Sequence, residues 1–314
     1  MPPHTSTVRP EVAAALAGGC GVVALESTLI AQGLPWPENL ATARAAESAV
    51  RAAGAVPATV AVLGGVVRIG LDDREIEALA RTAIDTVASA GVRVLKASRR
   101  DLGYAVARGR NAATTVAATL WLARRVRIGV MATGGLGGVH RGAGLSFDVS
   151  TDLDELAHAD GALVVCSGVK SILDIPATLE ALETRGVAVV GYRTDEFPAF
   201  TTRSSGLALT ARVDTPAEAA ALVDAHRQLG LPGAIVLAQP VPGDVAIAAD
   251  EMEAALPEAL AEAARRGVAG KDVTPFLLSL ILDATHGRSL AANTALIVNN
   301  AALAGQVATA LAGR

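Results

Sequence analysis

The chain has 314 residues, of which 51% are hydrophobic and 18% are charged, and its formal net charge at pH 7 is −4. This composition excludes intrinsic disorder and supplies enough apolar residues for a large buried core. The acidic balance, and the lack of a basic run with interleaved aromatic residues, argue against nucleic acid as a partner. We therefore expect a globular protein that acts on a small molecule.

The start of the chain and its apolar runs predict a soluble, cytoplasmic protein. Met1 to Ser6 lack the basic start, apolar core and cleavage site of a secretory signal. Runs such as Val22 to Leu25 and Ala162 to Cys166 are far shorter than the roughly 20 apolar residues of a membrane span, so no membrane partner is expected. Cys20 and Cys166 have no Cys or His neighbours at zinc-binding spacing and are expected to be free thiols.

Short β-branched runs alternate with longer alanine-rich stretches, which is typical of an α/β fold. The predicted strands are Val22 to Leu25, Val60 to Leu63, Val92 to Leu95, Ile128 to Ala132, Leu163 to Cys166, Val187 to Gly191 and Ile235 to Ala238. The predicted helices are Leu40 to Ala53, Arg74 to Ser89, Thr114 to Arg124, Pro216 to Leu229, Glu251 to Arg266 and Ser289 to Ala312.

These elements predict how the chain is organised. Strands joined by helices are expected to be parallel, and strands that are apolar throughout suit a sheet covered on both faces. No linker or repeat divides the sequence, although Gln239 to Gly243 form a Pro/Gly-rich joint before the last helices. We predict one domain over residues 1–314, with three α/β/α layers, a largely parallel central sheet and a helical C-terminal region from Asp250.

Polar residues follow several predicted strands directly, where open α/β sheets bind their ligands. The polar segments are Glu26 to Thr28, Lys96 to Asp101, Thr133 to Gly135 and Ser167 to Lys170. Because the carboxyl ends of parallel strands share one edge of a sheet, we expect these segments to converge on one cleft.

Lysine is rare in this chain, and this makes each lysine a candidate for chemistry that needs a primary amine. It occurs only as Lys96, Lys170 and Lys271, whereas arginine occurs 24 times. Lys170 follows a buried-type strand, where partial desolvation would favour a neutral amine able to attack a carbonyl group. The alternative is a lysine at a helix start with its amine in water.

Glu26 lies between an apolar strand and two hydroxyl residues. Partial burial there would favour the protonated carboxylic acid and make Glu26 a proton donor. The alternative is that it belongs to a turn or helix cap formed with Ser27 and Thr28.

A glycine-rich loop, Thr133 to Gly142, follows the predicted strand that ends at Ala132. Its N–H groups are able to approach an anion, although the loop matches neither GxGxxG nor the Walker A pattern and is alternatively a plain tight loop. The segment Asp148 to Asp152 comes next, with carboxylates and hydroxyls that suit a hydrated divalent cation, and Asp148 is the favoured ligand. Alternatively, Ser150 or Asp152 caps the helix that is expected to start near Leu153.

Several blocks of this sequence, in order along the chain, resemble the pseudouridine-5'-phosphate glycosidase family, formerly described as indigoidine biosynthesis proteins. The blocks are Val23 to Ile30, Gly54 to Thr59, Lys96 to Leu102, Ala132 to Gly142, Lys170 to Asp174, Thr274 to Leu278 and Ser289 to Asn293. The resemblance extends from about Val22 to the C-terminus. It departs from the family's pattern at Gly144-Leu145, where the family is more polar, and at Thr151, which replaces a small residue.

The resemblance implies cleavage of the C–C glycosidic bond of pseudouridine 5'-phosphate to uracil and ribose 5-phosphate. It implies that Lys170 forms a Schiff base, that Glu26 donates a proton and that Asp148 binds Mn²⁺. The implied substrate-binding residues are Lys96, Val116, Thr133, Ser150, Thr151, Asp152 and Asn293. The resemblance also implies a homotrimer, with a separate pseudouridine kinase as the pathway neighbour.

Two rival functions fit parts of the same pattern. A class I aldolase acting on another phosphosugar would also need an active lysine and an anion site. A non-catalytic protein that binds nucleotides or sugars would explain the glycine loop without an unusual amine. Release of uracil from pseudouridine 5'-phosphate would separate the three.

Overall fold

The computed structural model describes residues 5–83, 94–268, 270 and 273–314. Its first half contains β1 (Ser6–Val8), α1 (Pro10–Ala17), β2 (Val22–Leu25), η1 (Leu29–Gly33), α2 (Glu38–Ala52), β3 (Val56–Leu63), β4 (Val66–Ile69), α3 (Asp73–Arg81), β5 (Leu95–Ala97), η2 (Arg99–Asp101), α4 (Leu102–Ala107), β6 (Ala112–Thr114), α5 (Val116–Arg124) and β7 (Val130–Ala132). Its second half contains α6 (Ala143–Ser146), α7 (Thr151–Leu156), β8 (Leu163–Cys166), α8 (Ile175–Thr184), β9 (Ala188–Tyr192), β10 (Arg212–Val213), α9 (Pro216–Gln228), β11 (Ile235–Ala238), α10 (Ala249–Arg265), α11 (Val273–Ala284) and α12 (Arg288–Ala312).

Within the described residues one sheet has the strand order β1-β4-β3-β2-β7-β8-β11-β9-β10; β6 joins it by pairing with β3, and β5 pairs with β6. The middle of the sheet is parallel: β2 pairs with β3 and β7, and β8 pairs with β7 and β11. Every residue of β2, β8 and β11 is buried, as a parallel sheet covered on both faces requires. The predicted α/β class with a largely parallel sheet is confirmed.

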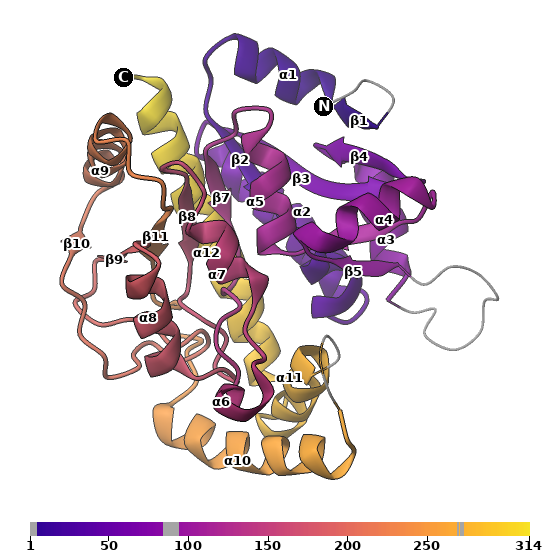
Figure 1. Ribbon diagram of the computed structural model, residues 1–314, viewed down its shortest axis with the longest axis vertical. Helices are drawn as coiled ribbons and strands as arrows, with labels where there is room; N and C mark the ends of the chain where they lie inside the picture. Colours follow the sequence, from indigo (N-terminus) through magenta and orange to yellow (C-terminus); the bar gives the residue numbers. More distant parts are fainter. Residues whose placement is uncertain (1–4, 84–93, 269, 271–272) are drawn as a thin grey trace.

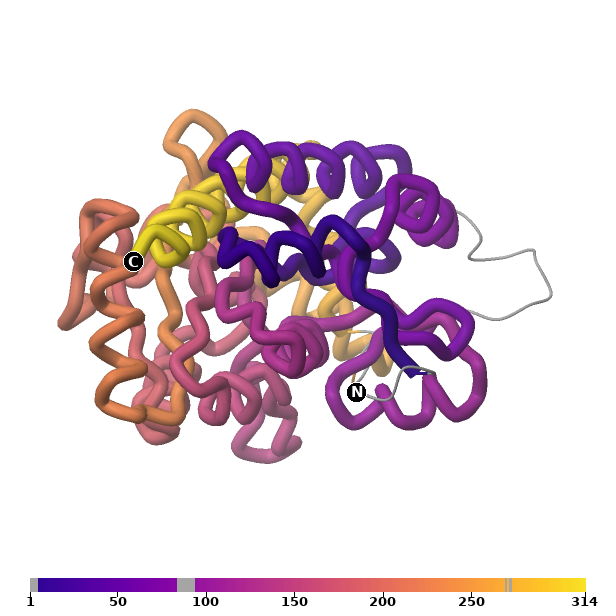
Figure 2. The backbone as a smooth tube through the Cα atoms, turned by 90° about the horizontal axis from the view of Figure 1, so that it is seen from above, coloured from indigo at the N-terminus to yellow at the C-terminus, as the bar shows by residue number. Residues whose placement is uncertain are grey.

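Helices cover both faces of this sheet (Figures 1 and 2). On one face α5 packs against α7 and against β2 and β3. On the other face α12 runs behind the sheet, where it contacts β2, β7 and β8 and packs along α2. The helices α10 and α11 pack on each other beside the near end of α12. The predicted three layers and helical C-terminal region are therefore present.

Among the described helices, only α12 is long and apolar enough to cross a membrane by length and composition. The sequence-based prediction considered only short apolar strand runs and did not identify this helix as a candidate. Half of its most apolar window is buried, against three strands and α2. These contacts are those of a core helix, so the fold itself accounts for the apolar composition of α12.

The sheet departs from the sequence-based prediction at both edges, where β1 and β10 were not predicted, and around β3. β4 and β6 both run antiparallel to β3, and neither was predicted as a strand. β3 and β4 are joined by a turn at Gly64 and Gly65, both with positive φ, a conformation that glycine adopts without strain. The predicted strand from Val92 and helix to Ser89 lie partly outside the described residues.

Candidate active site

A cavity of about 410 Å³ opens where the segments after β2, β7 and β8 converge, as expected for an open α/β sheet. We call it the carboxyl-end cavity. Nine of the predicted site residues line it: Glu26, Lys96, Val116, Asp148, Ser150, Thr151, Asp152, Lys170 and Asn293. The tenth, Thr133, is buried and does not line the cavity. Lys271, the remaining lysine, lies outside the described residues.

Glu26 directly follows β2 and is only 7% exposed. Two threonine hydroxyls donate hydrogen bonds to its carboxylate: Thr133 Oγ1 to Oε1 at 2.5 Å, and Thr28 Oγ1 to Oε2. The neighbouring Ser27 is occupied elsewhere, because its hydroxyl donates to the Val60 carbonyl oxygen. Glu26 is therefore oriented from both sides at the wall of the cavity, and among the described residues its carboxylate caps no helix.

Thr133 is held in turn by Asn300, a fully buried residue of α12. The Asn300 side-chain amide donates to the Thr133 carbonyl oxygen at 2.9 Å and to Ser167 Oγ at 3.1 Å. Thr133 follows β7, and Ser167 follows β8 three residues before Lys170. One amide group thus fastens together the segment that orients Glu26 and the segment that carries Lys170.

Lys170 is half-buried at the end of a tight connection after β8. Gly168 has φ +78°, and a Cβ there would collide with the Pro198 carbonyl oxygen, so this turn requires glycine. Two backbone bonds tie the connection to the glycine-rich loop: Leu136 N–H donates to Gly168 at 2.9 Å, and Lys170 N–H donates to Leu136 at 3.2 Å. The side chain of Lys170 therefore extends from a backbone that these contacts hold in place.

The thiol of Cys166, at the end of β8, offers no competing nucleophile. It is fully buried, and burial raises its pKa to about 12. The thiolate is the reactive form, so this cysteine is a core residue.

His140 lies between the cationic and anionic side chains of the cavity. Burial lowers the pKa of its imidazole, the Asp148 carboxylate opposes that effect, and the positive charges of Lys96 and Lys170 lower the pKa further. The charges of both lysines thus reach the same imidazole ring, although Lys96 lies in β5 and Lys170 follows β8. The cavity lining combines the two lysines and Arg100 with three carboxylates, from Glu26, Asp148 and Asp152.

Asp152 is buried, and its carboxylate accepts two backbone hydrogen bonds of 2.9 Å, from Ala117 N–H in α5 and from Gly137 N–H in the glycine-rich loop. Ser150 Oγ caps α7 by accepting from Asp152 N–H at 3.2 Å. The capping alternative therefore holds for Ser150, while Asp152 joins α5 to the glycine-rich loop. Both residues still face the cavity.

Several N–H groups of the glycine-rich loop donate hydrogen bonds within the protein. Besides Leu136 and Gly137, Val139 N–H donates to Thr178 Oγ1 at 2.9 Å and His140 N–H to the Asp148 carbonyl oxygen at 3.0 Å. These N–H groups are engaged within the protein, whereas Gly134 and Gly135 line the cavity, so approach of an anion to the loop stays a prediction. The loop's glycines also allow close packing, since a Cβ at Gly138 would collide with the Thr178 side chain.

The Asp148 carboxylate is more exposed than those of Glu26 and Asp152, which are buried. Its side chain is 40% exposed, and its Oδ2 lies 3.8 Å from His140 Nδ1. The described residues contain no group of three or more His, Cys, Asp or Glu side chains that would enclose a metal. This donor set fits an ion that keeps most of its water and is bound through one carboxylate, a mode common for hard divalent cations.

Two polar atoms at the cavity wall have no hydrogen-bond partner among the described residues, although they are buried. They are Thr115 Oγ1, at the start of α5, and Gln32 Oε1, in η1. A buried polar atom without a partner is costly, so both are candidates to contact a ligand. Neither residue was predicted, because no local sequence pattern marks either of them. Asn300 was missed for a similar reason, since its partner Ser167 is 133 residues away in the chain.

The model of the family described as indigoidine synthase A like protein matches residues 11–310. A pseudouridine-5'-phosphate glycosidase of Solibacter usitatus is 53% identical over 97% of this chain and 98% of its own length. The enzyme of that name from Herpetosiphon aurantiacus is 55% identical over 96% of both chains.

Two solved structures have the same fold. The prealnumycin C-glycosynthase AlnA, in complex with ribulose 5-phosphate, has a TM-score of 0.88 and 39% identity over 99% of this chain and 98% of its own. An indigoidine synthase A-like protein from Thermotoga maritima has a TM-score of 0.87 and 38% identity over 98% of this chain and 97% of its own. The resemblance to pseudouridine-5'-phosphate glycosidases that was expected from the sequence is confirmed by the relatives of that name. The chain is therefore an enzyme that belongs to the indigoidine synthase A-like family.

Proposed function

We propose that this enzyme cleaves the C–C glycosidic bond of pseudouridine 5'-phosphate, in a reversible reaction that gives uracil and ribose 5-phosphate. The observation that carries the proposal is the placement of Glu26 and Lys170 on one cavity, braced through Thr133 and Ser167 by the same Asn300 amide. Relatives that are more than 50% identical over nearly the whole chain bear the name of this activity.

The bond to be broken determines the residues needed. A C–C glycosidic bond has no leaving heteroatom to protonate, so the two-carboxylate route of ordinary glycosidases does not apply. In the proposed first step, the C1'–O4' bond breaks with its electron pair going to O4', which takes a proton from Glu26. The Lys170 amine then adds to C1' and forms a C–N bond.

The second step separates the base. A proton is delivered to uracil C5 as the C1'–C5 bond breaks with its electron pair going to C5, and the nitrogen lone pair of Lys170 forms the C=N bond of an iminium ion. Water adds to this ion, and the C–N bond breaks to release ribose 5-phosphate and the free amine. The net reaction consumes one water per substrate, and Glu26 is the proposed proton carrier in both steps.

The phosphate group needs positive charge and donors at a distance from Lys170. We assign the phosphate to the part of the cavity lined by Lys96, by the N-terminal end of α5 at Val116 and by the unpartnered Thr115 hydroxyl. Thr151, at the start of α7, completes the proposed contacts. Mn²⁺ bound by Asp148 would supply further positive charge for the phosphate.

Asn293 and Gln32 are the proposed contacts of the base. Both line the carboxyl-end cavity, and Gln32 Oε1 lacks a partner among the described residues. Uracil presents two N–H donors and two carbonyl acceptors, and a side-chain amide is able to pair with both kinds of group.

The direct test is to incubate the enzyme with pseudouridine 5'-phosphate and Mn²⁺ and to measure uracil release. Stoichiometric uracil and ribose 5-phosphate are expected. An aldolase would release a C–C cleavage fragment of the sugar and no uracil, and a binding protein would release nothing. Uridine 5'-phosphate is the matched control, because its N-glycosidic bond has a heteroatom leaving group.

A homotrimeric assembly and a kinase that supplies the substrate are further proposals, which the resemblance to the family implies. A single domain over residues 1–314 and a cytoplasmic location are proposed from the sequence pattern. Sedimentation of the full chain tests the assembly.

A further inference from the structure

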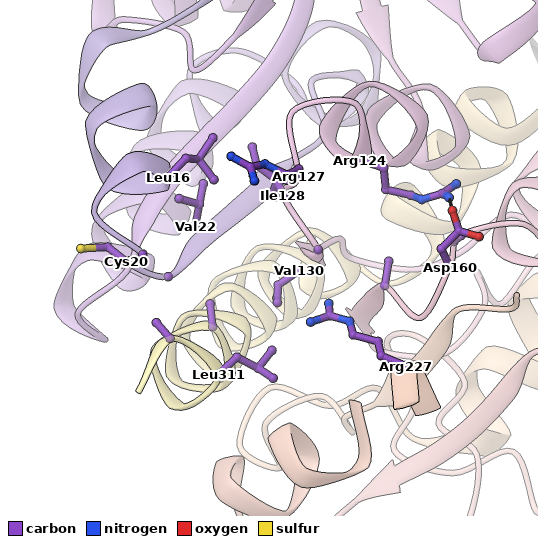
Figure 3. A pocket seen from close by; sticks show the side chains of 17 residues that line it. Leu16, Cys20, Val22, Arg124, Arg127, Ile128, Val130, Asp160, Arg227 and Leu311 are labelled. Atoms are coloured by element: carbon purple, nitrogen blue, oxygen red, sulfur yellow. Dashed lines mark hydrogen bonds and ion pairs between the residues drawn. The ribbon is translucent and has the colours of Figure 1, made fainter. Parts of the chain in front are cut away.

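A second cavity, of about 510 Å³, lies at the opposite end of the sheet, where β2, β7 and β8 begin (Figure 3). We call it the amino-end cavity. Its floor is apolar, with Val22, Ile128 and Val130 at the strand starts and Leu311 at the end of α12. Among the described residues, it shares no lining residue with the carboxyl-end cavity.

The charges of this cavity are predominantly positive. Its charged lining residues are Arg124, Arg127, Arg227 and Asp160. Arg124 is already paired, with Asp160 and with the buried Glu155, and Figure 3 shows it directed at Asp160. Two guanidinium groups, of Arg127 and Arg227, are therefore not balanced by a carboxylate of the lining.

The fold is built to admit the side chain of Arg227. A Cβ at Gly161 would lie 2.8 Å from its Cγ, and a Cβ at Gly129 would lie 2.5 Å from its Nη2. Its Nε donates to the Gly161 carbonyl oxygen at 3.2 Å, and the guanidinium is directed toward Val130 (Figure 3). Burial lowers the pKa of Arg227, and Asp224 only partly opposes this. An anion in the cavity would offset that desolvation.

Arg127 occupies a backbone position that favours glycine. It follows the end of α5 with φ +66°, and Ile128 N–H bonds back to the Ala123 carbonyl oxygen at 3.0 Å, as in a Schellman motif. Arginine is strained in this conformation, whereas glycine is not. The Arg127 backbone N–H donates to the Arg124 carbonyl oxygen at 2.9 Å, but its exposed guanidinium group makes no hydrogen bond or ion pair with any described residue. No side-chain contact among the described residues therefore explains why a strained arginine stands at this position.

The ends of α5 and α9 also face this region, and the partial negative charge of helix C-termini attracts cations. That attraction explains a positive charge nearby. It does not explain why Arg227 lies across two glycines, or why arginine stands at a glycine position.

We propose that the amino-end cavity binds the phosphate group of a small phosphomonoester, held between Arg127 and Arg227 with its organic part against the apolar floor. Guanidinium groups match phosphate oxygens in bidentate geometry, and two of them suit a dianion. The site is separate from the carboxyl-end cavity, so the inference stands independently of the reaction proposed for that cavity.

The test is calorimetric titration of the full chain with inorganic phosphate and, separately, with ribose 5-phosphate. The wild type is expected to bind one more equivalent of each per chain than the Arg127→Gly/Arg227→Gln double variant. Arg125→Gln is the matched control, because Arg125 is an exposed neighbour stacked on Trp121 and outside the cavity lining; it should bind like the wild type. Equal stoichiometry in the wild type and the double variant, or equal loss in Arg125→Gln, would overturn the proposal.

Arg127→Gly alone separates ligand binding from folding. Glycine relieves the strain at φ +66°, so this variant is expected to melt at a higher temperature than the wild type and yet to bind both probes at least tenfold more weakly at this site. Unchanged affinity overturns the proposal. A lower melting temperature also overturns it, because Arg127 would then serve the C-terminal end of α5.

Discussion

The side-chain amide of Asn300 donates a 2.9 Å hydrogen bond to the carbonyl oxygen of Thr133. Through this bond a residue of the last helix positions the threonine that orients Glu26, and a second bond from the same amide, to Ser167, reaches the connection to Lys170. Two catalytic candidates from different strands thus depend on one buried side chain.

Asn300→Ala is expected to lower turnover at least tenfold in enzyme that is still folded, because both segments lose their common anchor. It also leaves buried polar groups without partners, which should reduce the free energy of unfolding by about 1–3 kcal/mol. Asn299→Ala, at the preceding position of the same helix, is the control. Normal turnover of Asn300→Ala well below its melting temperature would show that Asn300 serves stability alone.

Thr133→Val removes the hydroxyl that donates to Glu26 Oε1 while keeping a similar shape. Turnover should fall about tenfold through misorientation of Glu26, with a smaller change in KM. The matched control is Thr119→Val, which removes a buried hydroxyl bonded to Thr114 and not to Glu26. Equal activity losses in the two variants would contradict the positioning role of Thr133.

Glu26→Gln keeps the shape of the side chain but cannot donate a proton as an acid. Turnover should fall by a factor of order 10² or more, while substrate binding survives. A purely structural Glu26 would instead give a lower melting temperature with near-normal turnover, so both quantities need to be measured on the same preparation.

Glu47 provides a test of the fold at a distance from the cavity. Burial raises the pKa of its carboxyl group, and the hydrogen bond from Thr59, at 2.6 Å, opposes that effect in part. The folded state therefore holds a proton that the unfolded state has released, so stability falls as pH rises from the ordinary glutamate range through the raised pKa.

Glu47→Gln should flatten this decline and raise the melting temperature above that pH window. The contrasting control is Glu11→Gln: the hydrogen bond from Arg51 lowers the pKa of Glu11, so its contribution is present at neutral pH and is lost on acidification. Melting curves across pH that show Glu47→Gln to be less stable than the wild type at neutral pH would contradict the assignment.

The sequence predicted the parts of the fold whose physical signal is local. The strands β2, β8 and β11 were predicted with their observed bounds, because each is a short apolar run between helical segments. β6 was missed: its sequence is Ala-Ala-Thr, which has no β-branched run, and it is a strand because it pairs with β3 and β5.

The candidate site divides in the same way. Glu26 and Lys170 were indicated because polar residues follow predicted strands there. In a parallel sheet the carboxyl ends of the strands share one edge, so residues that follow strands are expected at the ligand site. Asn300, Thr115 and Gln32 were not foreseen. Their importance comes from contacts between distant segments or from missing partners, and neither leaves a mark on the neighbouring sequence.

Asp148→Ala tests the proposed cation site. Because one carboxylate provides the protein's share of the ligands, the variant should bind Mn²⁺ at least tenfold more weakly in a calorimetric titration without substrate. Asp154→Ala, on the exposed side of α7 where Asp154 pairs with Arg185, is the control. Unchanged Mn²⁺ affinity in Asp148→Ala would return this residue to a structural role.

The central claim is that Lys170 forms a covalent bond with the sugar. Borohydride reduction of the enzyme during turnover of pseudouridine 5'-phosphate, followed by peptide mass spectrometry, tests it directly. We predict a ribose phosphate adduct on Lys170, and neither adduct nor turnover in Lys170→Arg, since arginine keeps the charge but forms no iminium ion. An adduct on Lys96 or Lys271, or near-normal turnover of Lys170→Arg, would contradict it.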